Sequence, residues 1–209
     1  MKLKLYSLLL LFAALVSVSS AQTYVSVTVD GDASEWAGVP LYESDPTTDS
    51  TSTADISAVY LANDDNYLYA LVEMTTDTVA LGADGGFYTF IDGNGNASEG
   101  FGPNGGSEFS EFASQESFFF FQSSGVFNTG GSPTGVDFLI APAAATPAQF
   151  YEMRFSRASD GFTGSPATTA FMVSPRDGAF AATDLAPNDA PTTYTFAISS
   201  SVSDWRMID

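Results

Sequence analysis

Short runs rich in Val, Thr, Tyr and Phe, separated by turn residues, constrain the fold of this chain more than any other feature. Eighteen glycines and ten prolines divide the 209 residues, and no helical period of useful length appears between them. Runs of this kind are typical of β-strands. We expect strands at residues 24–29, 55–62, 67–74, 87–91, 117–122, 150–155, 169–173 and 193–198.

Alternation within these runs indicates sheets with one buried face. In the run at 150–155, Tyr151, Met153 and Phe155 share one face, whereas Glu152 and Arg154 share the other, which we expect to be exposed to solvent. Residues 63–66 (Asn-Asp-Asp-Asn) predict a hairpin turn. Surface loops are expected at 41–54, 94–107, 123–135, 141–148 and 183–191. The sequence therefore predicts an all-β fold, an antiparallel β-sandwich or jelly roll.

The first 21 residues have the pattern of a secretory signal peptide. Lys2 and Lys4 precede an apolar run at 8–16, and small residues up to Ala21 favour cleavage before Gln22. We therefore expect residues 1–21 to be a signal peptide and 22–209 to be a single β-sandwich domain. The expected location is secreted, either extracellular or periplasmic.

Charge and missing residue types exclude several function classes. The chain has 25 acidic and 6 basic residues and a net charge of −19, so we expect no binding to nucleic acid or to anionic lipid surfaces. Without Cys or His it has no disulfide, no thiol nucleophile, no Ser-His-Asp triad and no histidine ligand for haem. No catalytic motif is present, and no later segment is apolar enough to insert into a membrane. We expect a monomer that is not an enzyme.

Four stretches in this order resemble family 9 carbohydrate-binding modules and their DOMON-like relatives. They are Val29-Asp30-Gly31-Asp32-Ala33-Ser34-Glu35-Trp36, Ala54-Asp55-Ile56-Ser57-Ala58-Val59-Tyr60, Asn63-Asp64-Asp65-Asn66-Tyr67-Leu68-Tyr69 and the segment 88–101 that contains Asp92-Gly93-Asn94-Gly95-Asn96. The resemblance covers most of 24–155. It implies a secreted β-sandwich, immunoglobulin-like or carbohydrate-binding-module-like in architecture, that binds sugars without cleaving them and is often stabilised by calcium.

The loop after Asp92 is a candidate calcium site. Asp92, Asn94 and Asn96 place oxygen atoms at alternate positions, Glu99 follows, and Glu108 comes close enough in sequence to return to the same ion. Calcium prefers carboxylate, amide and backbone oxygens. The alternative is an Asx-rich turn whose side chains bond their own backbone. The two interpretations are left open, and the resemblance favours calcium.

Aromatic residues offer candidate positions for sugar stacking. Trp36 either stacks on a sugar or anchors the core with its N–H satisfied, and the resemblance implies the structural role. The run of four phenylalanines at 118–121 places two rings on each face of a strand. The outward pair is either covered as core or exposed as a platform. Phe119, Phe121 and Trp205 are the candidate stacking residues.

These observations lead to one expected function and one alternative. We expect a secreted, non-catalytic protein that binds a polysaccharide or glycan through surface aromatic residues and polar loop residues, with calcium as a structural cofactor. The alternative is a structural or adhesive extracellular β-sandwich protein that has no sugar site.

Overall fold

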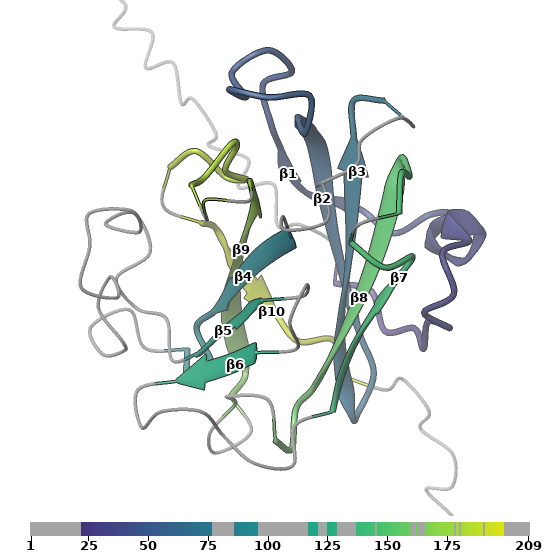
Figure 1. Ribbon diagram of the computed structural model, residues 1–209. Coiled ribbons are helices and arrows are strands. Elements are labelled where there is room, and N and C mark those ends of the chain that lie inside the picture. Colours follow the sequence, from purple (N-terminus) through teal and green to yellow (C-terminus); the bar gives the residue numbers. More distant parts are fainter. Residues whose placement is uncertain are drawn as a thin grey trace, which may run out of the picture.

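The strand-forming runs pair into two antiparallel five-stranded sheets, which pack face to face in the computed structural model (Figure 1). The structure describes residues 22–76, 86–95, 117–120, 125–128, 137–144, 146–159, 162, 166–177, 179, 181–189 and 191–198. For 117–120 and 125–128 it describes the backbone. The sandwich predicted from the sequence is confirmed.

The first sheet has the strand order β1-β2-β3-β8-β7. Its strands are β1 (Leu41–Ser44), β2 (Ile56–Asn63), β3 (Tyr67–Met74), β8 (Phe150–Ser156) and β7 (Phe138–Ala141). β2 and β3 form the expected hairpin, in which Asn63 pairs with Leu68. The Asp64 carboxylate holds the turn by accepting hydrogen bonds from the N–H groups of Asn66 and Tyr67, both at 2.8 Å.

The second sheet has the strand order β10-β9-β4-β5-β6. Its strands are β10 (Thr193–Thr195), β9 (Thr168–Arg176), β4 (Gly86–Ile91), β5 (Ser117–Phe120) and β6 (Gly125–Asn128). Backbone pairing places Phe118 opposite Phe90 and Phe119 opposite Thr89.

Apolar side chains from the two inner faces form the main core. Phe87 of the second sheet meets Tyr151 of the first edge to face, with ring centroids 4.8 Å apart. Phe155 and Phe171 make a similar contact across the sheets at 5.9 Å. All four of these side chains are fully buried, so ring contacts fix the position of one sheet on the other.

The N-terminal segment 22–39 covers the outer face of the first sheet. It contains a short 3₁₀-helix, η1 (Ala33–Trp36), which begins at Asp32, whose side chain accepts a hydrogen bond from the Ser34 N–H. Figure 1 shows this purple helix on the side of the first sheet that faces away from the second sheet. In the described part of the chain, no helix is long and apolar enough to cross a membrane.

Trp36 anchors this segment, as one of the two interpretations predicted. Its side chain is buried, and its Nε1–H donates to Glu152 Oε1 at 2.8 Å. Glu152 Oε2 accepts from the backbone N–H groups of Asp30, at 3.0 Å, and Gly31, at 2.7 Å. The expectation that Glu152 faces solvent is therefore wrong, because the N-terminal segment lies over Glu152 and buries it. Arg154, on the same face, stays partly exposed.

Within the described residues, the run at 24–29 and three short edge strands differ from the sequence-based expectation. The run at 24–29 makes only an isolated bridge, between Tyr24 and Asn63, because it packs on the sheet face instead of joining the sheet. β1 lies inside the segment expected to be a loop at 41–54, β6 lies inside the segment expected to be a loop at 123–135, and β7 was not expected. All three are four-residue strands at a sheet edge, where few neighbours impose an apolar pattern.

Candidate metal centre

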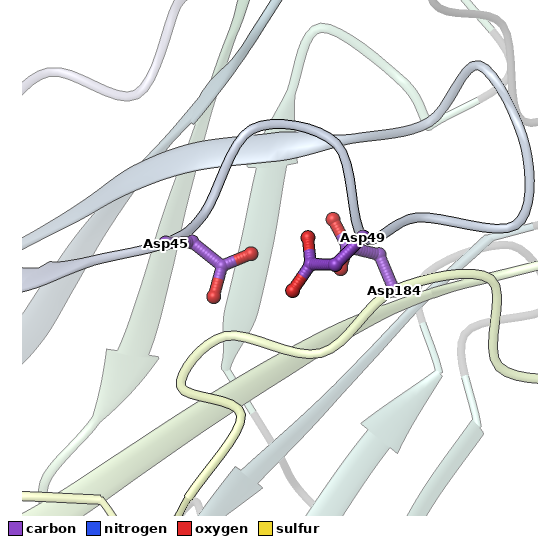
Figure 2. A group of neighbouring side chains, drawn as sticks. All are labelled: Asp45, Asp49 and Asp184. Atoms are coloured by element: carbon purple, nitrogen blue, oxygen red, sulfur yellow. The ribbon is translucent and has the colours of Figure 1, made fainter.

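Three aspartates from distant parts of the chain meet at one end of the sandwich. Asp45 and Asp49 belong to the loop between β1 and β2, and Asp184 belongs to the segment between β9 and β10. One carboxylate oxygen from each lies within 4.8 Å of the others. Figure 2 shows the three carboxyl groups turned toward one another. The cluster therefore joins a loop of the first sheet to a connection of the second.

Two members of the cluster are buried and one is exposed. Asp45 and Asp184 each retain 7% of their accessible surface, whereas Asp49 is exposed. The buried Oδ2 atom of Asp45 has no hydrogen-bond partner. Buried polar atoms are nearly always hydrogen-bonded, since leaving one unpaired costs the full desolvation penalty. This oxygen is thus the part of the cluster that most requires a ligand.

Hydrogen bonds hold four other oxygens of the cluster in place. Asp184 Oδ2 accepts from the Ile56 N–H at 2.6 Å, and its Oδ1 accepts from the Leu185 N–H at 2.8 Å. The Asn188 amide Nδ2 donates to Asp45 Oδ1 at 3.3 Å and to Asp49 Oδ2 at 2.5 Å. Asp184 is thus held by a strand of the first sheet and by its own segment, and Asp45 is linked through Asn188 to the connection between β9 and β10.

Each negative charge in the cluster disfavours ionisation of the neighbouring carboxyl groups. Burial, followed by the charges of Asp184, Asp49, Asp55 and Glu43, raises the pKa of Asp45 to about 8. Burial also raises the pKa of Asp184 to about 6, against the lowering effect of its two backbone N–H donors. A nearby positive charge would reverse this effect, because an opposite charge favours the ionised form.

A pocket beside the cluster gives access from solvent. It has a volume of about 270 Å³ and is lined by residues that include Glu43, Asp45 and Asn188. A second pocket, of about 360 Å³, lies where the β2–β3 turn meets the end of β8 and is lined by Asp65, Asn66, Tyr67, Ser156, Arg157 and Ala158.

The loop after Asp92, the calcium site expected from sequence, is described in part. Asp92 is buried, and its Oδ1 accepts from the N–H groups of Asn94, at 3.3 Å, and Gly95, at 2.7 Å. This is an Asx-type turn, one of the two interpretations left open above. The other three expected ligands, Asn96, Glu99 and Glu108, lie outside the described residues.

The candidate stacking residues are not placed by the structure. Phe119 belongs to β5, for which the backbone is described, and Phe121 and Trp205 lie outside the described residues. Their role in sugar binding stays a prediction.

Sequence reasoning missed the three-aspartate cluster. The available signal was the pair Asp45 and Asp49 in one polar segment, together with Asp184 and Asn188 in another. Asp45 and Asp184 are 139 positions apart, and the chain holds 25 acidic residues. Nothing in the sequence distinguishes this set from many other sets of carboxylates.

Comparisons with known proteins show a likeness in fold. The sequence matches no protein-family model and no curated protein. The structure is similar to a family 9 carbohydrate-binding module from Caldicellulosiruptor kristjanssonii in complex with cellotriose, with 15% identity, a TM-score of 0.50, and coverage of 86% of this chain and 94% of that one. A family 9 module from the same organism in complex with glucose has 15% identity, a TM-score of 0.47, and coverage of 86% and 96%. The expected resemblance to the family 9 modules is thus confirmed for the fold.

Proposed function

We propose that the protein is an exported, non-catalytic protein that binds a polysaccharide or glycan. The observation that carries the proposal is the likeness in fold to a module solved with cellotriose, which extends over 86% of the chain. The absence of His and Cys from the sequence supports a binding role over a catalytic one.

The 360 Å³ pocket offers one surface for a sugar among the described residues. Its side chains include an acid, an amide, a phenol ring and a guanidinium group, from Asp65, Asn66, Tyr67 and Arg157. Such groups hydrogen-bond to sugar hydroxyls and stack on sugar C–H faces. The pocket thus combines polar and aromatic groups, as the proposed mechanism requires.

Two groups in this pocket are held in fixed positions. The Tyr67 hydroxyl donates to Asp137 at 2.9 Å, and Arg154 lies over the Tyr67 ring at 4.5 Å. The Arg157 guanidinium donates to the Asp64 carbonyl at 2.8 Å and lies over the Phe196 ring at 4.0 Å. Preorganised side chains lose less entropy when a ligand binds.

Affinity electrophoresis tests glycan binding and locates its site. The mature chain runs through gels cast with neutral polysaccharides, among them hydroxyethyl cellulose, with calcium present. We expect one polymer to retard the protein and its free sugar to abolish the retardation. Loss of retardation in Tyr67→Ala places the sugar at the pocket, and loss in Phe121→Ala or Trp205→Ala places it at the residues expected from sequence. Leu139→Ala, which shortens an exposed side chain on β7, is the control.

One observation favours the alternative, a structural or adhesive protein with no sugar site. Among the large apolar side chains that the structure describes as exposed, Tyr24 is the only aromatic residue, at 37% exposure. Unchanged mobility across the whole panel would support this alternative and contradict glycan binding.

Export and calcium binding belong to the same proposal. Export predicts that the protein recovered outside the cytoplasm begins at Gln22, which intact-mass spectrometry measures. Calcium in the loop after Asp92 is compatible with the observed turn, because each carboxylate oxygen carries two lone pairs. Asp92→Asn should then weaken the stabilisation that calcium gives to the fold, as measured by thermal melting.

A further inference from the structure

Arg157 presents a positive charge to the 360 Å³ pocket, and no carboxylate in the described part of the chain forms an ion pair with it. The ion pair seen among the described residues joins Arg154 to Asp137. Arg157 Nη1 instead donates to a neutral group, the Asp64 carbonyl, at 2.8 Å, and its Nη2 makes no hydrogen bond with a described residue. Because acidic residues outnumber basic residues by 25 to 6, a guanidinium without a carboxylate partner is unexpected here. Its charge is available to a ligand.

Contacts on its other sides fix the Arg157 guanidinium in the pocket wall. It lies over the Phe196 ring at 4.0 Å, and the Arg157 backbone N–H donates to the Asn66 carbonyl at 2.8 Å. The neighbouring Asp64 carboxylate is engaged elsewhere, because it accepts hydrogen bonds from two hydroxyl groups and two backbone N–H groups. A ligand therefore meets a positioned cation and displaces no salt bridge.

We propose that this pocket binds glycan units that carry a carboxylate, such as uronic acids, more tightly than neutral sugar units, and that Arg157 confers this preference. The inference rests on the proposed function and names the substrate class of its site. A guanidinium donates charge-assisted hydrogen bonds to a carboxylate, which are stronger than those to a neutral hydroxyl. The Asn66 amide and the Tyr67 ring can contact neutral and acidic sugars alike, so neutral glycans remain weaker ligands.

Other charges of the protein limit how acidic the ligand can be. Asp65 is exposed on the β2–β3 turn and lines the same pocket, so it repels the carboxylate that Arg157 attracts. The chain as a whole has a net charge of −19, which opposes an acidic polymer along its whole length. Exposed charges are screened beyond about 8–10 Å at physiological salt, so a single acidic unit is affected mainly by the pocket. We therefore expect isolated acidic units within a largely neutral glycan.

NMR titration of the ¹⁵N-labelled, full mature chain at pH 7 tests the preference. The probes are the methyl glycosides of glucuronic and galacturonic acid, and each is compared with its uncharged amide of the same size. We expect at least one acidic glycoside to have a Kd about fivefold lower than that of its amide and to shift the backbone signals of Asn66 and Arg157. Equal Kd values for acid and amide would overturn the proposal. Acetate that binds as tightly as the acidic glycoside would also overturn it, because the site would then select an anion and not a sugar.

Two variants assign the preference to the pocket. Arg157→Gln should bring the Kd values of acid and amide within about twofold of each other, because the positive charge is lost. Asp65→Asn should raise the ratio of the two Kd values by about twofold, because an opposing charge is lost; Asp65 is exposed, so this variant should fold. Asp189→Asn is the control, since it removes an exposed charge at the other pocket and should leave the ratio unchanged.

The variants also show how the proposal could fail. A ratio that persists in Arg157→Gln, or that responds equally to Asp65→Asn and Asp189→Asn, would overturn it. Retardation of the chain by a polysaccharide, with no binding of any methyl glycoside, would overturn the acidic preference and leave the proposed function in place. Absence of both retardation and glycoside binding would contradict the two together, so the two failures are distinguishable.

Discussion

Replacing Glu152 by Gln tests how the N-terminal segment is held on the first sheet. The Glu152 carboxylate is fully buried and accepts three hydrogen bonds, from the Trp36 indole and from the backbone N–H groups of Asp30 and Gly31. Glutamine has the same size, but one of its two terminal atoms is a donor. In either orientation of the amide, at least one N–H group of the N-terminal segment faces another donor.

The expected cost follows from these contacts. A hydrogen bond to a charged group contributes about 1.5–3 kcal/mol, and an unpaired buried donor costs about 1–3 kcal/mol. Removing the charge of Glu152 also removes the penalty for desolvating it. The net loss in the free energy of unfolding is therefore smaller than the summed contribution of the three hydrogen bonds to the carboxylate. We expect Glu152→Gln to lower the free energy of unfolding by about 2–4 kcal/mol, which corresponds to a fall in Tm of about 4–16 °C for a domain of this size.

Equilibrium unfolding in urea measures this loss. Glu73→Gln is the matched control, because Glu73 is partly exposed and makes only a long contact of 3.4 Å with the Tyr60 hydroxyl; its cost should stay below about 0.5 kcal/mol. In a double-mutant cycle, Trp36→Phe should cost less in the Glu152→Gln background, by about 1–2 kcal/mol. A loss below 0.5 kcal/mol for Glu152→Gln, or an additive cycle, would refute the reasoning.

Two further predictions concern acid stability and a turn. Burial alone would raise the pKa of Asp64, but hydrogen bonds from two hydroxyl groups and two backbone N–H groups hold it below its usual 3.8. The stability that Asp64 contributes is therefore complete above about pH 4 and is lost as the pH falls through the lower folded-state pKa; urea unfolding against pH should show a flatter acid limb for Asp64→Asn. Gly95→Ala should destabilise by about 1–3 kcal/mol, because φ is +70° and the new Cβ would lie 2.7 Å from Thr168 Oγ1. Gly38→Ala should destabilise the protein less, because φ is +90° but no atom lies within 4 Å of the added Cβ. Equal urea midpoints for the two variants would contradict the steric argument.

Long, strongly patterned strands could be predicted from the sequence, whereas the short edge strands β1, β6 and β7 could not. The run at 67–74 coincides with β3, and the run at 55–62 is displaced from β2 by one residue. These strands lie inside the first sheet and are largely buried on both faces, so apolar residues dominate them. The segment that contains β1 reads as a loop because it is rich in polar and turn residues.

The burial of Glu152 shows why local pattern is insufficient. Alternation in β8 correctly separates Tyr151, Met153 and Phe155, which face the core, from Glu152. Whether the other face of a strand meets water depends on what lies over it, and here a segment more than a hundred residues away covers it. The three aspartates were missed for the same reason, because their neighbourhood is created by loops of two different sheets.

The contact between Trp36 and Glu152 also sets an order of events during synthesis. The two residues are 116 positions apart, so at about 5–20 residues per second a ribosome makes Trp36 roughly 6–23 s before Glu152. During that interval β3 lacks its neighbour β8, so the apolar residues of the N-terminal segment have only the β2–β3 part of the sheet face to cover. The segment 22–39 is thus made early and is among the last parts of the chain to reach its final place.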